Sequence, residues 1–182
     1  MATPVIQGPR IQLRPARASD REERRALGHA PEVARGFGVT MLQPAEMTAE
    51  SADAWFARLS AEAHAWVIDL GGRFIGTLTL HSFVRADSRA SLAVAIFDAS
   101  LLGQGIGTEA VALAVRHAFE ELDLHRLSIR VLASNTRAVR CYEKCGFKVE
   151  GRERESARVG DSWEDDLTMG LLREEWLTAS AT

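Results

Sequence analysis

Apolar residues recur along the chain with two periods, every second position in some segments and every three to four positions in others. Alternation predicts strands, and the longer period predicts amphipathic helices. The expected strands cover residues 10–14, 64–70, 74–81, 90–97 and 126–132, a segment from 147 onward, and 162–172. The expected helices cover 48–63, 108–122 and 136–145, with short helical segments that begin at 19 and lie around 176. This order predicts a mixed α/β fold, with a central sheet of about six or seven strands flanked by helices.

Turn signals fall between these segments. Gly71 and Gly72 predict a tight turn that joins two neighbouring strands. Ser19 and Glu22 have the spacing of a capping box at a helix start. Residues 28–44 are expected to form a loop or an irregular helical turn.

The length favours one folding unit. A chain of 182 residues is close to the usual size of one domain, and it contains no repeat, linker or low-complexity tract. Hydrophobic residues make up 46% and charged residues 26%, which excludes wholesale disorder and fibrous repeats. We therefore expect a single domain over residues 1–182, with its core between about residue 10 and residue 177.

Charge and hydropathy narrow the classes of partner. The net charge is −3 and no Lys/Arg run occurs, so a nucleic-acid partner is not expected. The longest apolar run, 92–97, is far too short to span a bilayer, so no membrane partner is expected. The first residues resemble no signal peptide, which predicts a cytoplasmic protein. The two cysteines, Cys141 and Cys145, have no second pair to complete a metal site, and they are expected to pack in a reducing compartment.

The segment Leu101–Thr108 is the strongest chemical signal. It carries Gly103, Gly105 and Gly107 between an expected strand and a long helix. Glycines let main-chain N–H groups turn toward a ligand, and the helix N-terminus favours anions, so the segment predicts a pyrophosphate cradle. It matches neither a P-loop nor a dinucleotide-binding fingerprint. The alternative is a strand-to-helix turn that simply requires glycine.

A second motif runs from Asn135 to Phe147, from a strand end into a helix, and contains Tyr142-Glu-Lys-Cys-Gly-Phe. Together with Gly-Gln-Gly-Ile-Gly-Thr-Glu-Ala from residue 103, it resembles the GNAT superfamily of acetyl-CoA-dependent N-acetyltransferases. The C-terminal segment 160–176 is similar to the branch that holds ribosomal-protein alanine N-acetyltransferases and bacterial spermidine acetyltransferases. The resemblance extends from about Arg10 and is strongest between residues 95 and 147.

The resemblance implies acetyl-CoA as the co-substrate, a GNAT-like fold and a set of site residues. Main-chain groups that pair with pantetheine are implied at Ala95, Ile96 and Phe97. Turn residues whose amides hold the pyrophosphate are implied at Leu102, Gly103, Gln104, Gly105, Ile106, Gly107 and Thr108. Asn135 matches the asparagine near the thioester, and Tyr142 matches the tyrosine that protonates the departing thiolate. An isolated tyrosine on a helix is otherwise a half-buried packing residue.

The chain departs from the family pattern at two places. Leu102 stands where the motif usually has Gln or Arg, so Arg137 or Arg140 is expected to supply positive charge. Many relatives carry a glutamate near the start of the strand before the glycine turn, whereas Ala90-Ser91-Leu92 offers none.

No general base stands out in the sequence. The titratable candidates are Asp165, His81 and His125, acting through water. A simple hydrogen-bonded packing role is the alternative for the two histidines, and a place in a solvated turn is the alternative for Asp165. Trp163 is a candidate for lining an acceptor groove or for a contact in a homodimer.

The sequence therefore predicts direct acetyl transfer to a primary amine, with the two substrates bound together. The absent carboxylate favours an α-amine at a peptide or protein N-terminus, because such an amine loses its proton more easily than lysine. A polyamine or another small amine remains an alternative acceptor. The sequence is also compatible with a cysteine nucleophile at Cys141 or Cys145, and with a module that binds acyl-CoA without turnover.

Overall fold

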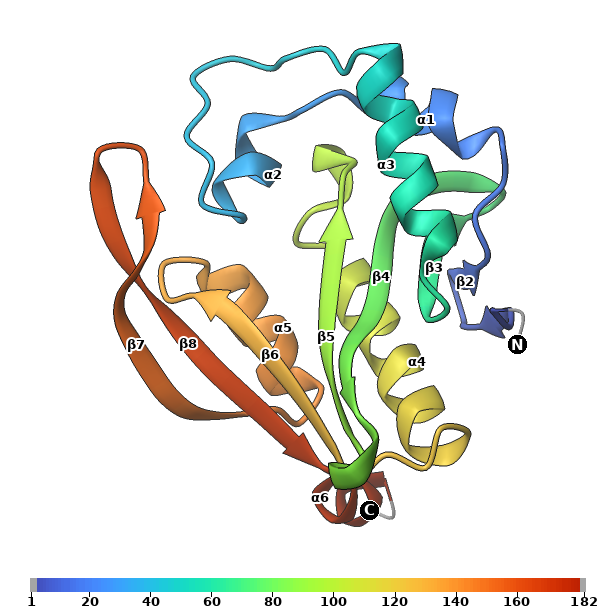
Figure 1. Cartoon of the computed structure of the whole chain (residues 1–182), viewed down its shortest axis with the longest axis vertical. Coiled ribbons are helices and arrows are strands. Elements are labelled where there is room, and N and C mark those ends of the chain that lie inside the picture. Colours follow the sequence, from blue (N-terminus) through green and yellow to red (C-terminus); the bar gives the residue numbers. More distant parts are fainter. Residues whose placement is uncertain (1–2, 181–182) are drawn as a thin grey trace.

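The computed structural model describes residues 3–180 and confirms the mixed α/β class, with one eight-stranded sheet. The strand order is β1-β2-β3-β4-β5-β6-β8-β7 (Figure 1). The strands are β1 (Ile6–Gln7), β2 (Gln12–Arg14), β3 (Ala65–Leu70), β4 (Arg73–Val84), β5 (Arg89–Ile96), β6 (Arg126–Leu132), β7 (Lys148–Val159) and β8 (Ser162–Leu172). The strand that the hydrophobic pattern did not predict is β1, because two residues are too few to show a period.

The helices fall close to the expected positions. They are α1 (Asp20–Leu27), α2 (Pro31–Arg35), α3 (Ala49–Ala61), α4 (Ile106–Glu120), α5 (Thr136–Lys144) and α6 (Arg173–Ser180), with short 3-10 turns η1 (Arg85–Asp87) and η2 (Ala99–Leu101). Ser19 precedes α1, but its side chain makes no capping hydrogen bond. No helix within residues 3–180 is long and apolar enough to cross a membrane.

Strands β5 and β6 are paired over only part of their length. They are the parallel neighbours in the sheet, and pairing covers Arg89–Ser91 against Arg126–Ser128. Beyond these residues the two strands diverge, as the opening between them in Figure 1 shows. The sheet therefore stays closed at one end of β5 and opens at the other, which leads toward η2 and α4.

Helices cover both faces of the sheet. Trp66 and Ile68 of β3 pack in the larger core with α4, whereas Val67 packs in a second cluster with Leu59 of α3. Successive residues of a strand point to opposite faces, so the buried run in β3 serves both layers. As a result α4 and α5 lie on one side, and α1, α2 and α3 lie on the other (Figure 1).

A buried ion-pair cluster ties the N-terminal segment to the sheet. The guanidinium of Arg14 is 1% exposed and bonds to Asp20 at 2.8 Å and to Asp69 at 2.5 Å. Asp69 also accepts the N–H of Gly72 in the turn between β3 and β4. Because a buried charge is costly unless it is paired, this cluster fixes how α1 and β2 approach β3.

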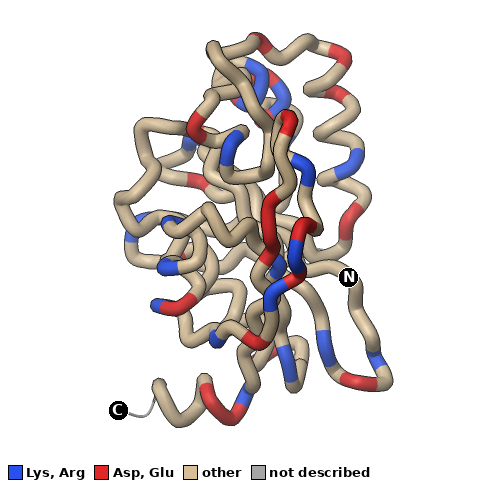
Figure 2. Tube along the Cα trace, turned by 90° about the vertical axis from the view of Figure 1, so that its left-hand side faces the viewer, with Lys and Arg blue, Asp and Glu red and all other residues tan. Residues whose placement is uncertain are grey.

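The β7–β8 hairpin projects from the open side of the sheet (Figure 1). Its acidic and basic residues are interspersed rather than gathered by sign, as Figure 2 shows. Trp163 on β8 is 60% exposed, while Trp66 is fully buried and Trp55 packs edge-on against Phe74. The tryptophans thus divide between core packing and one exposed position on the hairpin.

Candidate active site

A cavity of about 720 Å³ lies where β5 and β6 separate. Its walls come from β5, the glycine turn, α5, the end of β6 and α2. Tyr142 lines it together with most of the implied cofactor residues, which are Ala95, Ile96, Leu102, Gly103, Gly105, Gly107, Thr108 and Asn135. Phe97, Gln104 and Ile106 lie outside its lining. The fold therefore brings two distant sequence motifs to one hollow.

One edge of β5 is free beside this cavity. The N–H of Phe97 donates to the carbonyl of Ile75 on β4 at 2.8 Å, so Phe97 faces β4. Main-chain groups of successive strand residues point to opposite sides, which directs those of Val94 and Ile96 toward the gap. Neither residue has a strand partner on that side within residues 3–180. A ligand that enters the gap therefore meets main-chain N–H and C=O groups of β5 that pair with no other strand among the described residues.

The glycine turn has the backbone shape of an anion cradle. Gly103 and Gly105 both have φ +79°, a left-handed conformation that other residues adopt at a cost. Gly105 is the N-cap of α4, and the first N–H groups of the helix have no partner within the helix. A side chain placed on Gly103 would meet no atom within 4 Å, so its surface is open to a ligand.

Arg10 and Glu109 hold this turn in place. Arg10 donates to the carbonyl of Gln104 at 3.0 Å and pairs with Glu109 at 2.7 Å. Burial by itself would raise the pKa of Glu109, but hydrogen bonds from the main chain and side chain of Arg10 lower it overall. The carboxylate thus stays charged and links the N-terminal segment to the first turn of α4. The sequence motif did not reveal this pair, since its members lie 99 residues apart.

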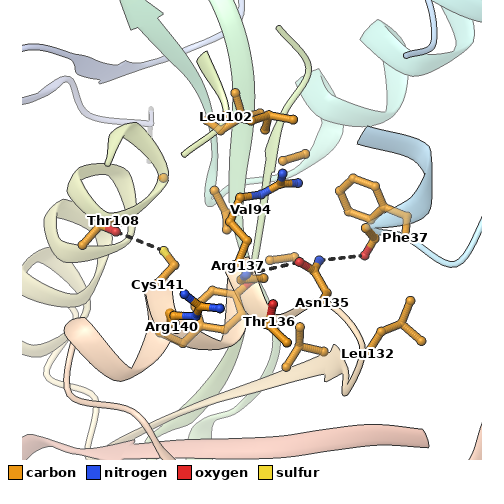
Figure 3. Close-up of a pocket in the computed structure, with 18 of the residues that line it drawn as sticks. Phe37, Val94, Leu102, Thr108, Leu132, Asn135, Thr136, Arg137, Arg140 and Cys141 are labelled. Atoms are coloured by element: carbon orange, nitrogen blue, oxygen red, sulfur yellow. Dashed lines mark hydrogen bonds between the residues drawn. The ribbon is translucent and has the colours of Figure 1, made fainter. Parts of the chain in front are cut away.

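Asn135 joins α5 to α2. Its Oδ1 accepts the N–H of Ala138 at 3.2 Å and caps α5, while its Nδ2 donates to the carbonyl of Gly36 at 3.2 Å (Figure 3). Phe37 follows directly and is 57% exposed at the cavity rim. Asn135 therefore positions the wall opposite the glycine turn, in addition to any contact with a ligand.

Tyr142 lies on α5 and faces the same cavity. Its side chain is 6% exposed and packs edge-on against Phe147. Burial raises the pKa of Tyr142 above its ordinary value, and the neighbouring cysteines add to the effect. The hydroxyl is therefore protonated across the physiological pH range, and it makes no hydrogen bond within residues 3–180. A protonated hydroxyl that makes no other hydrogen bond can donate one to a ligand in the cavity.

The two cysteines bond to α4 rather than to a histidine. Cys141 accepts a hydrogen bond from the Thr108 hydroxyl at 3.4 Å, and Cys145 donates to the Thr108 carbonyl at 3.4 Å. Hydrogen bonds from Cys145 and Thr108 lower the pKa of Cys141. No histidine of the described residues lines the cavity. A Cys-His nucleophile pair is therefore missing from the described part of this site.

Basic residues follow one face of α5. Arg137, Arg140 and Lys144 all line the cavity, at the three- to four-residue spacing that places side chains on one helix face. None of the three forms an ion pair within residues 3–180. They supply the positive charge that Leu102 does not.

The three base candidates all lie away from the cavity. His81 and His125 are exposed near the closed end of β5, and Asp165 is bound by Arg152 at 2.9 Å and by the N–H of Glu155. These hydrogen bonds lower the pKa of Asp165.

The neighbouring Asp166, which the sequence analysis did not select, does line the cavity. It is buried and accepts hydrogen bonds from Arg130 at 2.7 Å and from Ser156 at 2.9 Å. Only the register of β8 against β6, which sets Asp166 opposite Leu132, reveals its direction. Within residues 3–180 no cluster of three side chains that could hold a metal is present.

The split strand pair, the glycine turn and the α5 motif define an acetyltransferase architecture. Residues 10–148 match the family described as acetyltransferase (GNAT) domain, and the chain belongs to this family. The resemblance inferred from the two motifs is thereby confirmed.

Individual relatives refine this placement. The chain is 36% identical over 103 residues to the probable N-acetyltransferase YjcK of Bacillus subtilis, a match that covers 57% of each protein. It is 24% identical over 173 residues to the spermidine N(1)-acetyltransferase of Escherichia coli strain K12, which covers 94% of this chain and 91% of that protein. A solved acetyltransferase of the GNAT family from Bacillus anthracis shares the fold, with a TM-score of 0.80 at 20% identity over 94% of this chain and 99% of that one.

Proposed function

We propose that this protein transfers the acetyl group of acetyl-CoA directly to the α-amine at a peptide or protein N-terminus. The observation that carries the proposal is the single cavity that joins the free edge of β5, the glycine turn and Tyr142. Acetyl-CoA supplies an activated thioester as the acyl donor. The chain's own residues bind it, orient it and supply a proton.

The cavity fits the parts of acetyl-CoA in order along its length. The unpaired main-chain groups of Val94 and Ile96 suit the amides of pantetheine, which pair as an added strand would. The amides of the glycine turn and the start of α4 suit the pyrophosphate. Arg137, Arg140 and Lys144 add positive charge for the remaining phosphate. Within the turn, the N–H groups of Leu102 and Gln104 already donate to the carbonyls of Ala99 and Leu101, so the N–H groups of Gly103 and Gly105 are the ones left for the pyrophosphate.

Catalysis in this scheme rests on positioning and on one acid. Holding the amine against the thioester contributes up to roughly 7–11 kcal/mol in favourable intramolecular models. As the amine nitrogen bonds to the carbonyl carbon and the C–S bond breaks, the Tyr142 hydroxyl delivers a proton to the departing sulfur. The nitrogen loses its surplus proton to water, and water returns a proton to the tyrosinate. A positioned acid of this kind typically contributes about 10²- to 10⁴-fold to the rate. A cysteine intermediate is not part of this scheme, because Cys141 and Cys145 have no histidine beside them to act as a base in the described part of the chain.

The cavity's charges favour an amine that loses its proton unaided. Asp166 is the carboxylate that lines the cavity within residues 3–180, and it is already paired with Arg130. At pH 7 about a tenth of an α-amine with a pKa near 8 is neutral, against less than about a thousandth of a lysine amine with a pKa near 10.4. An α-amine therefore reacts without a dedicated base.

A polyamine is the second candidate, favoured by the E. coli spermidine N(1)-acetyltransferase that aligns over most of the chain. The acidic residues of β8 would have to attract such a cation. Arg152 engages Asp165, and Arg130 engages Asp166. Little free negative charge remains at the cavity to hold a polycation.

Thiol release from acetyl-CoA by the purified chain tests the proposal. A short peptide with a free N-terminus should release thiol at least about tenfold faster than spermidine at equal concentration, because its amine is more often neutral. An N-terminally blocked peptide that contains lysine serves as the matched control and should be a poor acceptor. Strong preference for spermidine would instead support the second candidate, and binding of acetyl-CoA without release to any amine would indicate a non-catalytic module.

A further inference from the structure

A second arginine is buried close to the active-site cavity, and it has no acidic partner among residues 3–180. Arg24 of α1 is 4% exposed. Its Nη1 donates to the carbonyl of Gly28 at 2.6 Å, and its Nε has no hydrogen-bond partner within residues 3–180. The guanidinium carbon lies 4.1 Å from the centre of the Phe97 ring. A buried cation thus rests on an aromatic face with part of its hydrogen-bonding capacity unused.

A buried guanidinium without an anionic partner is energetically costly. Burial lowers the pKa of Arg24, and no carboxylate of the described residues counteracts the effect. The contrast with Arg14 is direct, since Arg14 is similarly buried but is paired with Asp20 and Asp69. Buried arginine charges are as a rule paired. The described residues therefore provide carboxylate partners for Arg14 but none for Arg24.

Arg24 faces a small cavity of about 150 Å³. That volume is about tenfold what one water molecule needs, so a small polar group fits there. Other residues of its lining include His29, Met41 and Phe97. The pKa of His29 is lowered, first by burial and then by the charge of Arg24. His29 thus stays neutral and leaves Arg24 as the charge at this cavity.

The small cavity adjoins the larger one at α2. The two share Val33 and Phe37 in their walls. Phe97 directly follows Ile96, whose main chain faces the gap of β5. Arg24 therefore lies next to the part of the site that remains for the acceptor once acetyl-CoA occupies the cradle.

We propose that Arg24 and the small cavity form a subsite for a carboxylate carried by the acceptor amine. Guanidinium groups bind carboxylates through charge-assisted hydrogen bonds, and the Nη2 of Arg24 makes no hydrogen bond within residues 3–180. The assignment rests on the proposed acetyl transfer and narrows its acceptor. It favours an amine with a nearby acid group over a polycation, which the buried charge repels.

The carboxylate has two sources with the same chemistry, the α-carboxylate of a free amino acid and an acidic side chain near a peptide N-terminus. Binding of acetylated products distinguishes them without involving amine protonation. Calorimetry on the protein with bound CoA compares N-acetyl-leucine with N-acetyl-leucinamide in one arm. The other arm compares N-acetyl-Ala-Glu-amide with N-acetyl-Ala-Gln-amide.

The carboxylate form should bind at least about tenfold more tightly in one of the two arms, as expected for a hydrogen-bonded charge pair. Arg24→Met should remove the difference, whereas Arg24→Lys should keep a reduced one. Arg25→Met, one residue later on the exposed side of α1, is the matched control and should keep it in full. Melting temperatures of the variants show whether each is folded.

Equal binding of both members in both arms of the wild-type protein would overturn the inference. A preference that survives in folded Arg24→Met would overturn it as well. Thiol release is followed separately with Ala-Glu-amide and Ala-Gln-amide. If the protein binds the carboxylate form more tightly but releases no thiol with either peptide, the subsite is supported and the proposed acetyl transfer is not. If both peptides are acetylated equally fast and their products bind equally, acetyl transfer is supported and the subsite is overturned.

Discussion

The two sides of the active-site cavity are built by different means. The side that we propose for acetyl-CoA, called the cofactor side, is lined by β5, the glycine turn and one helix, α5. The side that we propose for the acceptor, called the acceptor side, gathers residues from α1, α2, β6 and β8, segments from opposite ends of the chain. A site made from main-chain groups in a tight turn needs glycine at fixed positions in the sequence. A site made from side chains needs only that the fold bring those side chains together. The first kind is therefore recognisable in a sequence, and the second is not.

The sharpest test of the cofactor side is Tyr142→Phe. Removing the hydroxyl keeps the ring that packs against Phe147, so the fold and acetyl-CoA affinity should persist. We expect kcat to fall by about 10²-fold or more, as for the loss of a positioned acid. Steady-state kinetics and calorimetry with acetyl-CoA measure the two quantities. Near-normal turnover would mean that the sulfur departs without this proton.

The glycine cradle should respond to a smaller change. Gly105→Ala places a side chain at φ +79°, which costs about 1–2 kcal/mol in the left-handed region. The turn is expected to relax and to weaken acetyl-CoA binding by about tenfold. Gly71→Ala is the matched control, because Gly71 also has positive φ and open surroundings but lies in the β3–β4 turn. If both variants bind acetyl-CoA alike, the turn is merely structural.

The pH dependence of the acetylation rate separates the contribution of Tyr142 from that of the acceptor amine. Burial raises the pKa of Tyr142, so this acid stays protonated as the pH rises and adds no descending limb between pH 7 and 9. The ascending limb belongs to the acceptor, whose neutral fraction rises about fivefold between pH 7 and 8 for an α-amine. Rates with a free-N-terminal peptide should follow that curve. A descending limb below pH 9 would assign the acid to another group.

The weakest expected effect concerns the charge on α5. Arg140→Gln should weaken acetyl-CoA binding by about threefold, since an exposed ion pair contributes under about 1 kcal/mol. The loss should shrink further in high salt, which screens exposed charges. Arg116→Gln, on the exposed face of α4, is the control. Equal effects of the two substitutions would show that only the overall charge of the protein matters.

The sequence by itself determined the class of fold, and it predicted the two motifs that line one side of the cavity. Local periodicity placed the long helices and most strands, because burial of one face requires that spacing. Gly103, Gly105 and Tyr142, which line the cavity, were predicted as site residues for a related reason. Their motifs are continuous in the chain, and the chemistry of the glycine turn depends on local backbone shape.

Only the tertiary structure decided the rest. It showed that Phe97 pairs with β4 while Ile96 faces the gap, that Asp166 rather than Asp165 lines the cavity, and that Arg24 is buried without a carboxylate among the described residues. Each of these facts depends on which distant segment lies opposite a residue. In the sequence Arg14 and Arg24 are two arginines among many; strand register and helix packing pair Arg14 with Asp20 and Asp69 and leave Arg24 without a carboxylate among the described residues.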